Sequence, residues 1–509
     1  MRQLHLIISN AAIMWVTRIF LLIPQLILVP YLIGTIGEAG YGVYVLAWSL
    51  LVTIDQLETS SQQGVVKYSA AFLAQKQINR LNKIVSSSLV YSTGLAFLTC
   101  LGILVAAAFY SSPSGKIIVG LVAVGIVVLL IVPLTPYIAV IQSKQLYYVG
   151  ALAETVSKYI GLFILVIWFH TIGPSVESLI IIMVGLQFLS RLAQVPLAYR
   201  LVPGLRCHPR LFDGGSLLLI AQFGAAAVLV SLCLAANSTG IRWLMGMLVS
   251  TSFVAHLAII LMPGELLSEI VLAMTITVMP ATSAYQAMGN QPMMQKLLIR
   301  GMRYTTILVL AGLLMAGFLM RNVLSVWVGT EYVFLAPYAL VVFASGAFML
   351  STSTSHHMLK GLGKLREVVL IYLSALFIVP VGTILGVFQS SRNPYLAITV
   401  GLVAGHLVCG FLNMVFCARA VRANLWEVIM RVYAQPLVVA LISWLILLVI
   451  VMYSGLDGFI ERIYVSVLAM LIFFGGCYIF AASADERRQL RGMATAALSK
   501  LRKKYGNPI

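Results

Sequence analysis

The chain has 509 residues, of which 61% are hydrophobic and only 9% are charged. Soluble domains carry about 25% charged residues, so this composition excludes an ordinary soluble globular protein. The formal net charge of +18 would suit a nucleic-acid-binding protein. Lys/Arg-rich cytoplasmic loops of a membrane protein explain the same excess, and the topology decides between these two explanations.

Apolar segments of membrane-spanning length recur along the whole chain. They are continuously apolar, which is typical of transmembrane helices. We therefore predict an all-α integral membrane protein with about 14 transmembrane helices. The first segment is too long for a cleaved signal peptide, so we expect it to be retained. The eighth is too long for one straight span, so it projects past the membrane or begins later. The predicted spans cover residues 7–33, 42–66, 84–110, 117–141, 147–170, 176–199, 215–236, 243–280, 304–326, 335–359, 367–388, 395–418, 432–454 and 463–482.

The distribution of Lys and Arg over the predicted loops gives the orientation. With the N-terminus inside, the cytoplasmic segments hold 25 of the 33 Lys and Arg residues, and the outer loops hold 5. Such a bias orients membrane proteins with short loops, so we expect both termini in the cytoplasm. The loops also account for the net charge, and we expect no nucleic-acid partner. The basic tail after residue 484 is typical of a helix on the anionic inner leaflet.

A short pattern occurs twice along the chain. The sequence AFxA at 71–74 recurs as AYxA at 284–287, and Lys83 recurs as Lys296, each 213 residues later. Each copy follows the second span of a six-span block, so the two halves run parallel, related by an axis along the membrane normal. We predict two six-helix lobes around a central cavity, followed by two helices and a tail. The predicted boundaries are 1–210, 211–425, 426–484 and 485–509.

The second predicted span carries polar side chains at membrane depth. Asp55 and Glu58 stand three residues apart and therefore share one helix face, with Gln62 one turn further. Even lenient insertion scales put a carboxylate at the bilayer centre at about 2.5–3.5 kcal/mol. We expect this face to line a water-filled cavity and to contact the substrate.

Two more spans of the first lobe carry charges. Arg18 in the first span either pairs with an acid of the second span or waits for an anionic substrate, because its planar guanidinium binds two phosphate oxygens at once. Glu154 and Lys158 stand at i and i+4 with the acid first, the better order for an ion pair. They are either a structural pair or part of the cavity. We expect Arg191, near the inner end of its span, to snorkel to the interface.

The second lobe has fewer candidates. Glu265 and Glu269 share a face, and His256 lies in mid-span, where a lone histidine is more often a packing residue than a functional one. We place all three among the cavity residues. Acids at this depth can also carry coupling protons or Na⁺. The six cysteines lack metal or redox spacing, and we predict no metal, no cofactor and no catalytic residue.

Several short motifs follow one another in a fixed order. They are Tyr41-Gly42-Val43-Tyr44, Val66-Lys67-Tyr68-Ser69-Ala70, Met279-Pro280, Ala287-Met288-Gly289-Asn290, Arg303-Tyr304 and Trp327-Val328-Gly329-Thr330-Glu331-Tyr332. Together with the span arrangement, they resemble the polysaccharide transporter branch of the multidrug/oligosaccharidyl-lipid/polysaccharide (MOP) exporter superfamily, over about residues 7–480. Its Wzx-type members are flippases of O-antigen and exopolysaccharide repeat units.

The resemblance implies a MATE-like fold and a flippase, not an enzyme, in a bacterial inner membrane. Such a protein moves undecaprenyl-pyrophosphate-linked oligosaccharide units from the cytoplasmic to the periplasmic leaflet by alternating access. Membrane lipids, a coupling proton or Na⁺, a polysaccharide polymerase and chain-length proteins are the expected partners. The resemblance places Arg18, Asp55 and Glu58 in the cavity.

One alternative has the same fold and another does not. A cation-coupled exporter of small amphipathic compounds would also use acids at membrane depth. A membrane glycosyl-polymerase or ligase would need larger external loops than the predicted spans leave.

Overall fold

The computed structural model describes residues 2–109, 116–144, 146–275, 277–389, 393–454 and 458–481. The basic tail predicted for 485–509 lies outside these residues. Every regular element in the described ranges is a helix. The α-helices are α1 (Arg2–Ala74), α2 (Ile78–Phe109), α3 (Lys116–Ile131), α4 (Thr135–Ser143), α5 (Tyr147–Thr171), α6 (Val176–Leu192), α7 (Gln194–Leu201), α8 (Gly214–Ala235), α9 (Ile241–Leu248), α10 (Thr251–Thr275), α11 (Val278–Ala287), α12 (Gln291–Trp327), α13 (Ala336–Ser351), α14 (Ser353–Gly361), α15 (Leu365–Gln389), α16 (Pro394–Ala420), α17 (Leu425–Ile429), α18 (Gln435–Ser454) and α19 (Phe459–Gly476). Short 3-10 or π turns are η1 (Val132–Leu134), η2 (Pro209–Leu211), η3 (Ala236–Gly240), η4 (Thr330–Leu335), η5 (Met430–Ala434) and η6 (Cys477–Ala481).

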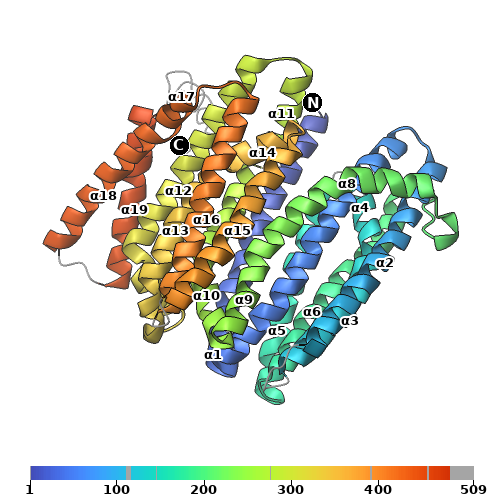
Figure 1. The fold of residues 1–509 in the computed structure, drawn as a ribbon, viewed down its shortest axis with the longest axis horizontal. Helices are drawn as coiled ribbons and strands as arrows, with labels where there is room; N and C mark the ends of the chain where they lie inside the picture. Colours follow the sequence, from blue (N-terminus) through green and yellow to red (C-terminus); the bar gives the residue numbers. More distant parts are fainter. Residues whose placement is uncertain are drawn as a thin grey trace, which may run out of the picture.

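The all-helical membrane architecture is confirmed. Thirteen helical segments of the described chain are long and apolar enough to cross a membrane. The first of them, Phe20–Ala74, is 55 residues long and contains the second predicted span and the later part of the first. Gly37 breaks α1 with φ 73° and ψ 172°, a backbone conformation that glycine adopts without strain. Figure 1 shows the first arm of α1 running down from the N-terminus to a turn, after which the second arm rises beside α8.

The boundary between the seventh and eighth predicted spans is wrong. The predicted spans leave residues 237–242 as the turn, but η3 continues α8 into α9, and the chain turns only at 249–250. The eighth span therefore begins later than predicted, at Thr251, which was one of its two expected explanations. Thr239 explains the difference, because its hydroxyl lies 2.7 Å from the Thr53 hydroxyl and donates to the Ser49 carbonyl at 3.0 Å. These contacts satisfy polar groups inside a span. The over-long eighth span becomes α10 and α11.

The 213-residue offset of the sequence repeat recurs in the helix starts. α2 begins at Ile78 and α12 at Gln291, which are 213 residues apart. α10 begins at Thr251, 213 residues after Glu38, the first residue past the break in α1. We call α1–α7 the first lobe and α10–α17 the second lobe. The seventh span, α8–α9, lies between them, since α8 packs against both α1 and α15.

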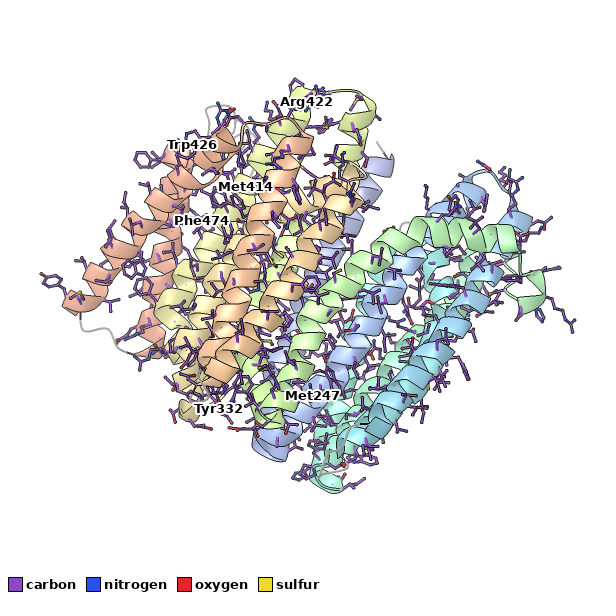
Figure 2. The ribbon with its side chains drawn as sticks, viewed as in Figure 1. Met247, Tyr332, Met414, Arg422, Trp426 and Phe474 are labelled. Carbon is purple, nitrogen blue, oxygen red and sulfur yellow. The ribbon has the colours of Figure 1, made fainter. Side chains whose placement is uncertain are left out.

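The two ends of the bundle carry different sets of the predicted loops. Figure 2 places Arg422 and Trp426 at one end and Met247 and Tyr332 at the other. We call the first the basic end, because the turns predicted to be cytoplasmic lie there, and the second the opposite end. The Gly37 break lies at the opposite end, because the next residue, Glu38, contacts Tyr332 there (Figure 2).

The apolar core joins the lobes at one end only. At the opposite end one continuous core contains residues of both lobes, from Val29 and Tyr41 to Leu324 and Tyr332. At the basic end two separate cores contain residues 65–220 and 230–432. Because burial of apolar surface is the main force that holds packed elements together, the lobes are attached at the opposite end.

Helices α18 and α19 stand outside the two lobes. They pack against each other and against α12, at the edge of the molecule farthest from α2 and α3 (Figure 1). One core between them is centred on Leu447, Val465 and Ala469, and a second joins them to Leu310 and Leu314 of α12. They therefore extend the second lobe.

A polar stripe on α2 holds the segment that connects the lobes. Asn82 donates to the Gly204 carbonyl at 3.1 Å and accepts from the Arg206 amide at 2.9 Å. The Ser86 hydroxyl accepts a hydrogen bond from the backbone amide of residue 208 at 3.0 Å, and the Ser87 hydroxyl accepts one from that of residue 213 at 2.9 Å. The connecting segment is thereby fixed to the first lobe, which also fixes the start of α8.

Replacing Asn82 tests this attachment. Asn82→Ala removes two hydrogen bonds of about 1 kcal/mol each, so opening of the segment should become about tenfold more frequent or more. We expect faster tryptic cleavage after Arg206 and Arg210, measured on the purified protein. Thr93→Ala is the matched control, because the Thr93 hydroxyl bonds only within α2. Equal cleavage of the two variants would contradict the attachment.

Candidate functional site

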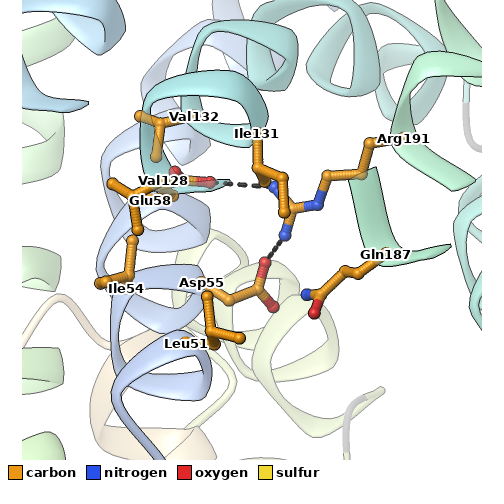
Figure 3. Close-up of a pocket in the computed structure, with 9 residues that line it drawn as sticks. All are labelled: Leu51, Ile54, Asp55, Glu58, Val128, Ile131, Val132, Gln187 and Arg191. Atoms are coloured by element: carbon orange, nitrogen blue, oxygen red, sulfur yellow. Dashed lines mark hydrogen bonds and ion pairs between the residues drawn. The ribbon is translucent and has the colours of Figure 1, made fainter. Parts of the chain in front are cut away.

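The mid-span acids of α1 form a cluster with an arginine of α6. The guanidinium of Arg191 contacts the Asp55 carboxylate through Nη2 and the Glu58 carboxylate through Nη1, the latter at 3.0 Å. Figure 3 shows the guanidinium reaching between the two acids. A planar guanidinium suits this task, because its N–H groups point in several directions at once.

Burial makes this cluster expensive to disturb. The Glu58 side chain is 3% exposed and that of Arg191 is 12% exposed, whereas Asp55 remains 45% exposed. A buried carboxylate requires a paired charge and hydrogen bonds. Arg191 supplies both for Glu58, which explains why the chain can keep this acid at membrane depth.

A small pocket lies against the cluster. It has a volume of about 10 Å³, room for about one water molecule. Its wall comes from α1, α3, η1 and α6, all within the first lobe. The Gln187 Oε1 atom is buried without a hydrogen-bond partner among the described residues and belongs to this wall (Figure 3).

Two expectations concern this cluster. Asp55 and Glu58 were expected to line a cavity between the lobes; Arg191 pairs with both from the first lobe, Glu58 is buried and Asp55 stays 45% exposed, so the cavity assignment stays a prediction. Arg191 was expected to snorkel, and instead it turns inward to the acids. The sequence contained a signal for this contact, because two acids on one face need a nearby cation and Arg191 is at comparable depth. Gln62, one turn further on, is buried.

The charges of the fifth span form the i, i+4 ion pair. Lys158 Nζ lies 3.2 Å from the Glu154 carboxylate and 6.0 Å from the ring centre of Trp48. Lys158 also lines a second pocket of about 40 Å³ with Gln25 and Tyr44. Lys158 is therefore part of a largely apolar site between α1, α5 and α6, inside the first lobe.

The acids of α10 do not act as a pair. Glu265 contacts Arg242 of α9, a residue that the predicted topology placed in an outer loop. Glu269 lies one turn further along α10 and has an interaction of its own. The side chain of Arg18 lies outside the described residues, so its predicted partner is not placed.

His256 of α10 lies where the two lobes meet. Its Nε2 is 3.2 Å from the carboxylate of Glu38, the residue after the Gly37 break, and its Nδ1 is 2.7 Å from the Tyr395 hydroxyl. The Tyr332 hydroxyl donates to the same Glu38 carboxylate at 2.8 Å. Sequence reasoning found His256 but missed Glu38, which lies outside the predicted spans.

Comparisons with known proteins concern the fold. No protein-family model matches the chain, and no curated protein does. The lipid II flippase MurJ in an inward closed conformation matches with a TM-score of 0.65 at 14% identity, over 92% of this chain and 99% of that one. The chain has the fold of MOP-type transporters.

Multidrug transporters share this fold. An inward-facing multidrug resistance MATE family transporter of the MOP superfamily matches with a TM-score of 0.64 at 13% identity, over 82% of this chain and 99% of that one. A mutant of the Vibrio cholerae MATE transporter VcmN matches with a TM-score of 0.60 at 14% identity, over 82% and 99%. The MOP-type fold thus covers both lobes of this multi-pass membrane protein.

Proposed function

We propose that this protein is a flippase of polyprenyl-pyrophosphate-linked oligosaccharides. The observation that supports this most is the extent of the match. The flippase structure covers 92% of the chain and the multidrug transporter 82%. The difference is about 50 residues, the length of two membrane spans. Two spans, α18 and α19, lie outside the lobes. We take them to be an addition that serves a lipid-linked substrate.

The separate cores give the proposed route. The lobes share one core at the opposite end and have separate cores at the basic end. A head group enters between the lobes at the basic end, which the charge bias makes cytoplasmic. The polyprenyl tail stays in the membrane. Opening of the opposite end and closing of the basic end then release the head group on the other side.

Lys360 of α14 is a candidate contact to a pyrophosphate. It lies near the basic end, within about one helical turn of His356 and His357, and His356 is bonded to the Tyr372 hydroxyl at 3.3 Å. Among the described residues no carboxylate lies within ion-pair distance of Lys360, whereas Lys364 pairs with Glu367 at 3.7 Å. An unpaired cation at this depth is a candidate ligand for an anionic head group.

The alternative is a cation-coupled exporter of small amphipathic compounds. Multidrug transporters of the same fold are the reason to consider it. The acids of α1 were its strongest support. Arg191 now lies between them, where a coupling cation would have to bind. The geometry of this site therefore favours the flippase.

Transport in proteoliposomes tests the proposal. The probe is undecaprenyl pyrophosphate carrying a fluorescent disaccharide, with a membrane-impermeant quencher outside. We expect protein-dependent movement of the probe between leaflets, and no ethidium export under a proton gradient. Ethidium export without movement of the lipid-linked probe would establish the alternative.

Lys360→Gln tests the head-group contact in the same assay. Loss of a charge-assisted contact to phosphate should lower the initial rate about tenfold. Lys364→Gln is the matched control and should retain the rate, because Lys364 is half exposed and paired with Glu367. Equal rates in both variants would exclude Lys360 from the head-group site.

A further inference from the structure

We propose that Glu38 and His256 form a proton-operated latch that holds the two lobes together at the opposite end. The latch rests on the proposed alternating access but not on the identity of the substrate. It connects the first lobe, through the residue after the Gly37 break, with three elements of the second lobe.

The Glu38 carboxylate meets two side chains from different elements of the second lobe. The Tyr332 hydroxyl of η4 donates to Oε1 at 2.8 Å, and His256 Nε2 of α10 lies within ion-pair distance of Oε2, at 3.2 Å, without a hydrogen bond. Tyr332 is buried, and the His256 side chain is 11% exposed, whereas Glu38 is 37% exposed. The carboxylate at the edge of the first lobe therefore meets two largely buried side chains of the second lobe.

Aromatic rings fix the imidazole in its place. The His256 ring centre lies 5.8 Å from those of Tyr332 and Tyr395 and 5.7 Å from that of Phe334. Its Nδ1 is 2.7 Å from the Tyr395 hydroxyl on α16. Because Nδ1 is hydrogen-bonded to Tyr395, the imidazole cannot turn away from Glu38 without breaking that bond.

The contact depends on the charge of the imidazole. When His256 is protonated, the imidazolium forms an ion pair with the Glu38 carboxylate through its Nε2 side, while Nδ1–H donates to the Tyr395 hydroxyl oxygen. When it is neutral, only one ring nitrogen donates and the ionic attraction is lost. Proton loss from His256 therefore weakens the attachment of the lobes, and proton uptake strengthens it.

Few other groups around the latch can titrate. Tyr332 of η4 and Tyr395 of α16 touch it, with Glu331 of η4 and Tyr338 of α13 beside them. Imidazole is the side-chain type among these that ordinarily changes charge between about pH 5 and 8. Trp327 also bridges the lobes here, donating to the Leu26 carbonyl at 2.7 Å, but it does not titrate.

The latch predicts a pH-dependent opening of the opposite end. Spin labels at two exposed positions, Ile172 at the end of α5 and Val326 at the end of α12, report the distance between the lobes in proteoliposomes without substrate. We expect the ratio of open to closed molecules to rise about tenfold between about pH 6 and about pH 8.

Three variants decide whether the latch causes this rise. Glu38→Gln and His256→Gln should remove the pH dependence, whereas His406→Gln should retain it. His406 is the matched control, because it bonds Ser345 at 3.0 Å within the second lobe alone.

Tyr395→Phe is a milder variant that keeps the test decisive if Glu38→Gln or His256→Gln fails to fold. It keeps the Glu38 contact and removes one hydroxyl, so it should shift the pH midpoint without abolishing the transition. A wild-type protein without pH dependence, or full pH dependence in both Glu38→Gln and His256→Gln, would overturn the latch. The spin-label measurement uses no substrate. If the lipid-linked probe failed to move, that failure would count against the proposed function and would not change the pH dependence of the distance between the lobes.

Discussion

Arg191→Gln should destabilise the protein more than any other single change in the first lobe. The variant leaves Glu58 buried without the cation that pairs with it, and an uncompensated buried charge costs about 3–5 kcal/mol. Asp55 contributes less, because it is half exposed and water can solvate it. Thermal unfolding in detergent, followed by size-exclusion chromatography, measures the loss.

Two further variants make this prediction specific. Arg200→Gln is the control, because Arg200 is exposed and should be replaceable without loss. The triple variant Arg191→Gln/Asp55→Asn/Glu58→Gln removes all three charges together, and we expect it to recover most of the stability. If the single variant were as stable as the wild type, the ion cluster would not be what holds α6 against α1.

Transport by the triple variant separates two roles for the cluster. A stable triple variant that still moves the lipid-linked probe would show that the cluster only holds the first lobe together. A stable triple variant that no longer moves it would show that the charges take part in transport. The proposed route between the lobes predicts the first outcome, because the cluster lies inside one lobe.

Gly42→Ala should force the lobes apart at the opposite end. A Cβ atom at Gly42 would overlap the carbonyl oxygen of Thr251 at the start of α10. Neither backbone can move without shifting a whole helix, so the closed arrangement is penalised by about 1–3 kcal/mol. Labels at Ile172 and Val326 should show about tenfold more open molecules than in the wild type.

Gly34→Ala is the matched control in the same helix. A Cβ at Gly34 meets nothing within 4 Å, and alanine favours a helix over glycine by about 1 kcal/mol. This variant should be as closed as the wild type and at least as stable. Unchanged opening in Gly42→Ala would contradict the close contact between α1 and α10.

The parts of the fold that follow from hydrophobicity were predictable. Apolar length alone located the spans, because a span must satisfy its backbone within the helix. The seventh span was misdivided because Asn237 and Ser238 look like a turn. Their donors find partners instead, since Asn237 Nδ2 donates to the carbonyls of Cys233 in its own helix and Tyr372 on α15. Partners from distant parts of the chain decide such cases, and composition does not reveal them.

The candidate site was predictable in its residues but not in its geometry. Asp55, Glu58 and His256 stood out because charged and polar groups at membrane depth need partners. Which partner each one meets depends on the packing of helices more than 100 residues apart, as for Glu58 with Arg191 or Glu38 with His256. Ion pairs between neighbours in one helix, such as Glu154 with Lys158, follow from spacing alone.

Alternating access is tested most directly by measuring both ends of the molecule in the same variant. Labels at Ile172 and Val326 report the opposite end, and labels at Arg80 and Met293, two exposed positions near the starts of α2 and α12, report the basic end. In Gly42→Ala we expect the first distance to lengthen and the second to shorten relative to the wild type. If the basic-end distance stayed constant or lengthened as well, the two lobes would not alternate.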